Sequence, residues 1–274
     1  MSKKLLKDLK ETVKFLQKQY KKTPKAGIVL GSGLGNFASQ IKVEKEVPYA
    51  DIPHFPVSTV EGHSGKLIFG QLAGKTVVAM GGRFHYYEGY TPQDVVYPIR
   101  VMKMLGVETV LLSNAAGAVN ETFKVGDIMI IRDHISFFTP NPLIGKNVAE
   151  LGPRFPDMSQ PYKKDLIKKA KEIAAKNKFD IKEGIYVAVT GPTFETRAEY
   201  KLIHIVGGDV VGMSTVQECI AANHMGLPVF AVSIVTDIGI REDENIITHE
   251  EVLQAAKEAE PKLAVLFKEM VGLI

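Results

Sequence analysis

The stretch Thr76–His85, TVVAMGGRFH, sets the interpretation of the whole chain. Its first half is an uninterrupted apolar run, which is typical of a buried strand. Two glycines end the run, and Arg83 and His85 follow two residues apart. Residues two apart in extended backbone point to the same side, so a guanidinium and an imidazole would face one ligand. The pair favours an anion such as phosphate, although a surface arginine and a packed histidine explain the fragment equally well.

Similar apolar runs alternate with helical patterns along the chain. They are rich in Val and Ile without polar alternation, which indicates strands covered on both faces. The alternation predicts an α/β fold: a single domain, residues 1–274, with a mixed, largely parallel central β-sheet flanked by helices. The predicted strands are Ala26–Leu30, Lys66–Phe69, Thr76–Met80, Thr109–Ser113, Asp127–Ile131, Gly184–Thr190, Asp209–Gly212 and Val229–Val235. The predicted helices cover residues 3–20, 93–105, 163–177, 197–206, 215–225 and 249–271.

Composition excludes several classes of protein. The chain has 274 residues, 45% of them hydrophobic, which is enough for a sizeable core. Its net charge of +3 is too small to propose nucleic acid or a membrane as the main partner. No apolar run approaches the length of a membrane span, and Cys219 alone forms neither an intramolecular disulfide nor a cysteine metal cluster. We therefore expect a cytoplasmic protein.

Helix-start patterns place several residues where strands give way to helices. Thr248 and Glu251 have the spacing of a capping box, which predicts a helix with His249 in its first turn. Further starts are predicted at Thr196 and Ser214. The residues just before these starts, expected at strand–helix junctions, include Phe194, Glu195 and Met213.

Small residues gather after predicted strands. Gly31–Gly35, GSGLG, would let backbone N–H groups approach an anion, and Ser32 adds a hydroxyl donor. Asn36 stands where a dinucleotide-binding fingerprint needs glycine, and the loop lacks the ending of a Walker A motif. Ser113–Ala118, SNAAGA, also permits close approach to a ligand, and Ser214 adds a position that favours anions. Tight turns and an ordinary helix cap remain the alternatives for each feature taken alone.

Other residues suit a planar ligand with hydrogen-bonding groups. Phe194 could stack on a ring and Glu195 could accept from ring N–H groups, or they could be a helix staple and a surface carboxylate. Asp237 ends the last predicted strand, where it either functions or begins a turn. His63, in a glycine-flanked loop, is a candidate to reach the same site. No spacing of His, Asp or Glu resembles a metal-binding motif.

Seven motifs together resemble one family, the trimeric purine nucleoside phosphorylases. They follow the family's order and approximate spacing and span essentially the whole chain, which makes the resemblance highly specific. The motifs are GSGLG at 31–35, GGRFHYYEG at 81–89, SNAAGAVN at 113–120, GPRFPDMS at 152–159, GPTFETRAE at 191–199, VGMSTVQE at 211–218 and THEEV at 248–252.

The resemblance implies phosphorolysis in purine salvage: a purine nucleoside and inorganic phosphate would give free purine and ribose 1-phosphate, without metal or organic cofactor. It implies phosphate contacts at Ser32, His63, Arg83, His85, Ala115 and Ser214, with Asn114 also binding substrate. It implies ribose contacts at Tyr87, Met213 and His249, and purine contacts at Phe194, Glu195 and Asp237. Catalysis would rest on His85, Glu195, Asp237 and His249.

The resemblance also implies a homotrimer. Phe155 matches a residue that a neighbouring subunit lends to the substrate pocket. Phe155 lies in the irregular stretch 136–162, which carries five prolines. A loop of that length in a compact domain is usually functional or interfacial, so the two interpretations agree.

Asp237 departs from the family pattern. Members that prefer 6-oxopurines have Asn at this position, whereas relatives that act on 6-aminopurines have Asp. An ionised Asp can only accept hydrogen bonds, while Asn can also donate. Glu195, in contrast, is typical of the 6-oxopurine members. We therefore expect inosine and guanosine as the main substrates, with tolerance of adenosine.

Other functions stay open from the sequence. An adenosine or 5′-methylthioadenosine phosphorylase would agree with Asp237, although the polar His249 does not suit a methylthio group. A non-catalytic nucleoside-binding protein would not need a phosphate site. A nicotinamide-dependent dehydrogenase is disfavoured by Asn36.

Overall fold

The computed structural model describes residues 2–32, 34–57, 59, 64–240 and 247–274. These residues form a nine-stranded sheet with helices around it. The strands are β1 (Ala26–Val29), β2 (Lys42–Pro48), β3 (Lys66–Leu72), β4 (Lys75–Met80), β5 (Thr109–Ala118), β6 (Ile128–Ile135), β7 (Lys182–Ala188), β8 (Val210–Gly212) and β9 (Val229–Ile238). The α-helices are α1 (Ser2–Gln19), α2 (Pro92–Val95), α3 (Tyr97–Met104), α4 (Lys164–Lys176), α5 (Arg197–Ile205), α6 (Val216–His224) and α7 (His249–Gly272). The 3-10 helices are η1 (Gly35–Gln40), η2 (Tyr49–Asp51) and η3 (Tyr86–Glu88).

Strand β5 joins the two parts of the sheet. It pairs in parallel with β1 and β9 and antiparallel with β8. Because β8, β7, β6 and β9 also pair in succession, the strands from β5 to β9 close on themselves. On the other side of β5 the order is β1, β4, β3 and β2. Parallel and antiparallel pairings both occur, so the predicted mixed α/β fold is confirmed.

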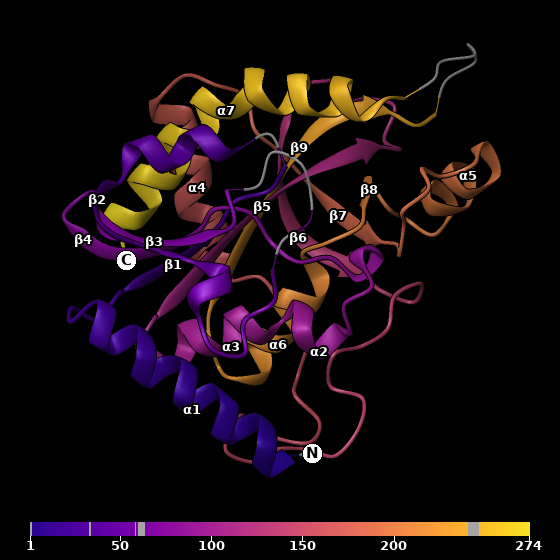
Figure 1. Ribbon diagram of the computed structural model, residues 1–274. Coiled ribbons are helices and arrows are strands. Elements are labelled where there is room, and N and C mark those ends of the chain that lie inside the picture. The colour runs from indigo at the N-terminus through magenta and orange to yellow at the C-terminus, as the bar shows by residue number, and fades with distance from the viewer. Residues whose placement is uncertain (1, 33, 58, 60–63, 241–246) are drawn as a thin grey trace.

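Helices cover both faces of this sheet (Figure 1). On one face α7 packs against β9 and α4. On the other, α3 packs against α1 and α6. Strand β1 is buried along its whole length and β9 along all but its last residue. Burial on both faces explains why these runs lack polar alternation.

The structure differs from the predicted elements in three respects: a strand that was not predicted, a helix that is divided, and the bounds of several strands. Strand β2 is absent from the predicted strands because its sequence, KVEKEVP, is charged and largely exposed, as suits a strand at the edge of the described sheet, where it pairs with β3. The helix predicted over 93–105 is two helices, since Pro98 lies in the first turn of α3, where a missing N–H is tolerated. Strands β3, β5, β6 and β9 continue beyond their predicted ends, to Leu72, Ala118, Ile135 and Ile238, and β7 begins and ends two residues earlier than predicted.

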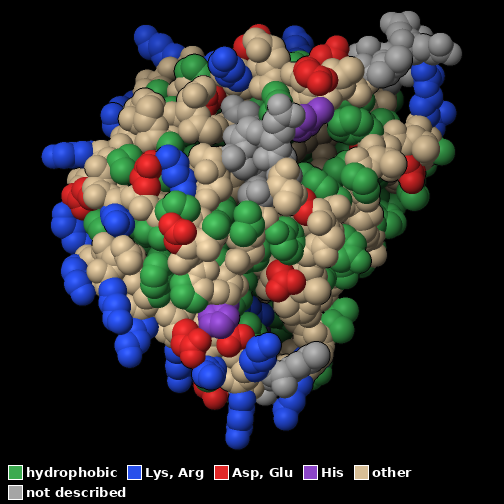
Figure 2. Space-filling view, viewed as in Figure 1, with side chains coloured by type: hydrophobic (Ala, Val, Ile, Leu, Met, Phe, Trp, Pro, Cys, Tyr) green, Lys and Arg blue, Asp and Glu red, His purple; other side chains and the backbone are tan. Residues whose placement is uncertain are grey.

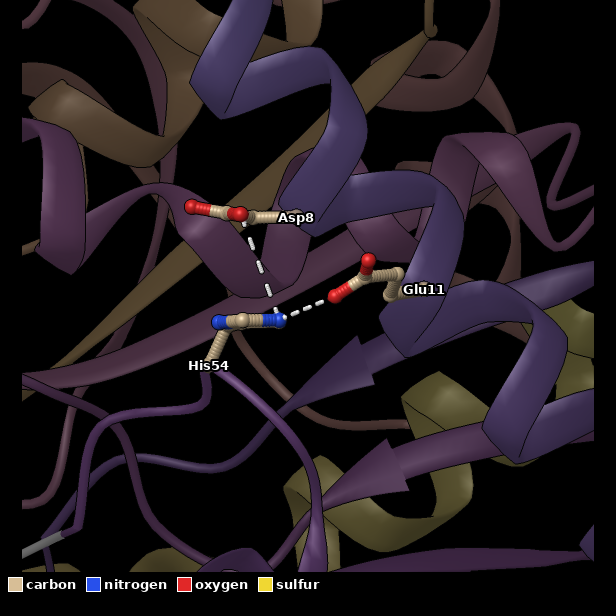
Figure 3. Close-up of side chains that lie close together, drawn as sticks. All are labelled: Asp8, Glu11 and His54. Carbon is tan, nitrogen blue, oxygen red and sulfur yellow. Dashed lines mark hydrogen bonds and ion pairs between the residues drawn. The ribbon is translucent and has the colours of Figure 1, made fainter.

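Helix α1 is attached to the loop that follows η2. Nε2 of His54 lies 2.8 Å from Oε2 of Glu11 and 4.0 Å from Oδ1 of Asp8, both on α1 (Figure 3). The buried Thr12 donates to the carbonyl of Pro53 at 2.7 Å. Lys and Arg side chains stand out along the lower left of the molecule, over α1 (Figure 2). Among the described residues, no helix has both the length and the apolar character that a bilayer span requires.

Helix α7 anchors His249 to the core. The predicted capping box forms: Oγ1 of Thr248 accepts from the N–H of Glu251 at 3.2 Å, and Oε2 of Glu251 accepts from the N–H of Thr248 at 3.1 Å. Further along the helix, Leu266 and Phe267 are fully buried. The first turn of α7 is therefore positioned by a helix whose apolar side is packed into the sheet.

Replacing Leu266 by Ala should lower the free energy of unfolding by about 2–5 kcal/mol, because truncation leaves a cavity in the core. Its neighbour Val265 is 37% exposed. The control Val265→Ala should cost less than about 1 kcal/mol. Urea unfolding followed by circular dichroism measures both changes. Equal losses would contradict the packing of α7 described above.

Candidate active site

A cavity that opens to solvent lies among residues that follow or end β1, β4, β5, β8 and β9. Twelve of the fourteen predicted site residues line it: Ser32, Arg83, His85, Tyr87, Asn114, Ala115, Phe194, Glu195, Met213, Ser214, Asp237 and His249. The wall is completed by Gly31, Ala116, Gly117, Val211, Gly212, Thr236 and Val252.

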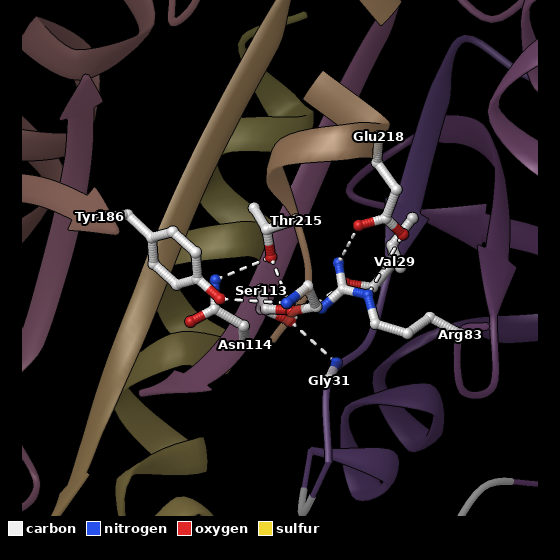
Figure 4. Close-up of polar contacts among 9 residues, drawn as sticks. Val29, Gly31, Arg83, Ser113, Asn114, Tyr186, Thr215 and Glu218 are labelled. Atoms are coloured by element: carbon white, nitrogen blue, oxygen red, sulfur yellow. Dashed lines mark hydrogen bonds and ion pairs between the residues drawn. The ribbon is translucent and has the colours of Figure 1, made fainter. Parts of the chain in front are cut away.

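Arg83 is buried in the cavity wall, and hydrogen bonds to its neighbours hold its guanidinium in one orientation (Figure 4). Its Nε and Nη2 donate to the two carboxylate oxygens of Glu218 at 3.1 and 2.8 Å. Its Nη1 donates to the carbonyl of Ser113 at 2.5 Å and to Oγ of Ser214 at 3.4 Å. Arg83 and Glu218 are both nearly inaccessible to solvent. A side-on pair of this kind fixes the guanidinium geometrically and neutralises its charge.

Behind Ser214 lies a strained turn. Thr215 has a φ of 70°, which costs a β-branched residue about 1–3 kcal/mol. Its Oγ1 accepts from Nδ2 of Asn114 at 2.8 Å and lies 3.1 Å from Oγ of Ser214. The N–H of Ser214 donates to the hydroxyl of Tyr186 at 3.2 Å. Oδ1 of Asn114 is buried with no hydrogen-bond partner among the described residues, so it can accept from a ligand.

The loop that carries Ser32 lies directly against β5. Oγ of Ser113 donates to the carbonyl of Val29 at 3.1 Å and accepts from the N–H of Gly31 at 3.3 Å (Figure 4). A β-carbon at Gly31 would lie 2.8 Å from the carbonyl oxygen of Ser113. Glycine is therefore required at this position by the close approach of two backbones.

His85 is held by Glu88. Oε1 of Glu88 lies 2.8 Å from Nδ1 of His85 and accepts from the N–H of His85 at 2.8 Å. The other oxygen accepts from the N–H and Oγ1 of Thr59 at 2.9 and 2.6 Å. Burial lowers the pKa of His85, and the Glu88 hydrogen bond offsets this only in part. Burial raises the pKa of Glu88, but the hydrogen bonds from His85 and Thr59 outweigh it and bring the value to about 2.

Two carboxylates, Glu195 and Asp237, line another part of the cavity. Burial raises the pKa of Glu195, and the charge of Asp237 raises it further. Asp237 is buried, and its Oδ1 accepts from Oγ1 of Thr236 at 3.0 Å. A β-carbon at Gly117 would lie 2.7 Å from Oδ2 of Asp237, so the glycine makes room for this carboxylate. Phe194 is 43% exposed and offers a ring face for stacking.

Two predicted residues are not placed in this cavity. His63 lies outside the described residues. Phe155 is 86% exposed, and the guanidinium carbon of Arg154 lies 5.6 Å from the centre of its ring. One group of three potential metal ligands occurs in the described part of the chain, at Asp8, Glu11 and His54, and it lies outside the cavity.

Sequence patterns missed Glu218 and misplaced the start of α6. The helix begins at Val216 with Thr215 as N-cap, so Ser214 precedes the cap, and Thr215 makes no side-chain cap bond. The spacing of Thr215 and Glu218 is that of a helix start, so the sequence predicts that the two side chains cap the helix. It does not predict their contacts with Asn114 and Arg83. A signal was present: a buried arginine needs a counter-charge, and Glu218 is the one acidic residue in α6.

Comparison with known proteins agrees with this geometry. The Phosphorylase superfamily matches residues 25–272. The chain is 48% identical to purine nucleoside phosphorylase 1 of Geobacillus stearothermophilus over 263 residues, which is 96% of each chain. A solved structure of Schistosoma mansoni purine nucleoside phosphorylase with inosine has a TM-score of 0.93 at 42% identity, over 98% of this chain and 96% of that chain. A structure of the same enzyme with adenosine has a TM-score of 0.92 at 42% identity, over 97% and 96% of the two chains.

The mixed α/β fold is that of these purine nucleoside phosphorylase structures over almost the whole chain. The chain belongs to the Phosphorylase superfamily. Within that superfamily it is a member of the purine nucleoside phosphorylase family.

Replacing Glu88 by Gln should lower the pKa of His85 further, because the Glu88 carboxylate stabilises the protonated imidazole through a hydrogen bond and its charge. NMR titration of the His85 ring protons measures the shift. The exposed Glu121→Gln serves as control and should leave the His85 titration unchanged. A His85 pKa that stays constant or rises in Glu88→Gln would contradict this account.

Proposed function

We propose that this enzyme cleaves the glycosidic bond of purine nucleosides with inorganic phosphate, releasing free purine and ribose or deoxyribose 1-phosphate in purine salvage. A phosphate oxygen attacks the anomeric carbon while the bond from that carbon to N9 of the purine breaks. Positive charge develops on the sugar and negative charge on the purine. A cavity for this reaction must bind an anion at one end and stabilise the purine at the other.

One cavity contains both groups suited to phosphate and groups suited to a purine, and this supports the proposal. Ser32, Arg83 and Ser214 offer donors for phosphate. Phe194, Glu195 and Asp237 offer a stacking face and hydrogen-bonding groups for a purine. Holding both reactants together supplies much of the rate enhancement, because the attack becomes effectively unimolecular.

His85 would act on the phosphate as a neutral imidazole. Its lowered pKa favours the neutral form, and the ionised Glu88 favours the proton on Nδ1. Nε2 is then left as an acceptor, which suits a phosphate O–H. Asn114 and His249 support sugar binding: Oδ1 of Asn114 can accept from a hydroxyl, and His249 can orient the 5′-hydroxyl.

Base selection depends on Glu195 and Asp237. An ionised Glu195 accepts from the N1–H of a 6-oxopurine, which favours inosine and guanosine. An ionised Asp237 favours a 6-amino group, which adds adenosine as a secondary substrate. The relative from Schistosoma mansoni has been solved with inosine and with adenosine, which supports both bases as ligands of such a cavity.

We further propose a cytoplasmic homotrimer that needs no metal or organic cofactor. The exposed Phe155 supports lending of an aromatic ring to a neighbouring subunit, because a large apolar side chain so exposed suits an interface. Phosphate supplies the nucleophilic oxygen and, overall, its O–H proton is taken up by the purine that leaves. The reaction therefore balances without a redox or Lewis-acid partner.

The direct test is release of purine from inosine, guanosine and adenosine, each with and without phosphate. We expect phosphate-dependent release, fastest from inosine and guanosine. Fastest release from adenosine would instead make Asp237 the residue that selects the base. Binding of nucleoside without release in phosphate would overturn the proposed activity.

Replacing Asp237 by Asn should raise the ratio of kcat/KM for inosine to that for adenosine about tenfold, because the amide can donate to the 6-oxo group and the carboxylate cannot. Asp180→Asn, at an exposed position, is the matched control and should leave the ratio unchanged. Steady-state kinetics at saturating phosphate gives both values. Equal ratios in the wild type and Asp237→Asn would refute a role for Asp237 in selecting the base.

Phe155→Ala enzyme should lose activity, and mixed trimers that also contain subunits with an intact Phe155 should regain part of it. Phe155→Ala and His85→Ala subunits, dissociated and reassembled at equal amounts, would place an intact Phe155 beside an intact cavity in about a quarter of the sites. Activity well above that of either parent is expected. The control Phe137→Ala, at an exposed position in the same loop, should remain active alone. No gain on mixing would exclude a lent Phe155.

A further inference from the structure

The start of α6 has the sequence of a capping box but does not form one. Thr215 and Glu218 stand three residues apart, as Thr196 and Glu199 do at the start of α5. In α5 the box is complete: Oγ1 of Thr196 accepts from the N–H of Glu199 at 3.2 Å, and Oε2 of Glu199 accepts from the N–H of Thr196 at 2.7 Å. In α6 no side-chain cap bond is present, because Thr215 has a positive φ instead of the extended backbone of a normal N-cap.

Both polar side chains of the missing box are used elsewhere. Glu218 accepts two hydrogen bonds from Arg83, and Thr215 contacts Asn114 and Ser214 (Figure 4). Their partners line the cavity, whereas neither Thr215 nor Glu218 does. The first turn of α6 therefore forms a layer directly behind the cavity wall.

We propose that Glu218 is a positioning residue for phosphate binding, which acts by fixing the plane of the Arg83 guanidinium and balancing its charge. The inference rests on the proposed function, in which Arg83 and Ser214 face the phosphate. Glu218 holds Nε and Nη2, which turns Nη1 toward Ser113 and Ser214. Without the carboxylate, the guanidinium would keep its charge in a buried place and lose the partner that sets its orientation.

The charge of Glu218 also affects how the cavity can bind phosphate. Because Glu218 neutralises the charge of Arg83, net positive charge contributes little to the affinity for phosphate. The affinity must then come from hydrogen-bond donors in the correct orientation. Binding of phosphate should then depend on the orientation of Arg83. Binding of the purine, at Phe194 and Glu195, should not.

The first variant is Glu218→Gln, which keeps the size of the side chain and removes its charge. We expect KM for phosphate to rise about tenfold or more, while KM for inosine stays within about twofold of wild type. Asp94→Asn is the matched control, because Asp94 occupies the same position in α2 and completes an ordinary capping box with Thr91. It should leave KM for phosphate unchanged.

A second pair of variants shows whether Glu218 acts through Arg83. Arg83→Gln and the double variant Arg83→Gln/Glu218→Gln should have the same affinity for phosphate, within about twofold, because Glu218 has no guanidinium left to orient. Glu218→Asp keeps the charge on a shorter chain and should give a smaller rise in KM for phosphate than Glu218→Gln. It also provides a test if Glu218→Gln does not fold.

Loss of the phosphorolysis activity and loss of the positioning role of Glu218 would give different results. Wild-type enzyme that releases no purine with phosphate would overturn the proposed function. Active wild type with unchanged or tighter phosphate binding in Glu218→Gln, measured by calorimetry without nucleoside, would overturn the positioning role. So would an effect of Glu218→Gln that persists at full size in the Arg83→Gln background.

Discussion

The parallel pairing of β5 with β1 and β9 is the constraint on which the cavity depends. Parallel strands end at the same edge of a sheet, so the segments that follow them converge. Leu112 of β5 pairs with Val29, and Gly117 pairs with Asp237, which brings the loop of Ser32 and the end of β9 to opposite sides of β5. The register shift just before Gly117 adds a local irregularity, which re-aims side chains beside a site.

Charge pairing is the second constraint, because an unpaired charge at this depth is strongly destabilising. Arg83 is paired with Glu218, and His85 is hydrogen-bonded to Glu88. The part of the cavity lined by Arg83 and His85 therefore presents oriented donors with little excess charge. Burial together with the charge of Asp237 raises the pKa of Glu195. The two ends of the cavity differ in electrostatic character for this physical reason.

Much of the fold could be predicted from the sequence because burial on both faces leaves a clear pattern. The apolar runs that became β1, β4 and β9 have no other simple interpretation. Strand β2 escaped prediction because edge strands are short of apolar residues. The site residues found by motif lie at strand ends, where topology gathers them. Phe155, which the family resemblance places in the pocket of a neighbouring subunit, does not line the cavity of its own chain.

The start of α6 was mispredicted for a different reason. Local sequence and final structure agree at the starts of α5 and α7, where both capping boxes form. At α6 the same pattern is present, and tertiary contacts override it: Thr215 takes a strained backbone and Glu218 turns to Arg83. Natural proteins generally depart from local rules where function demands it. A capping pattern that its own helix does not use, next to a buried arginine, therefore points to a functional constraint.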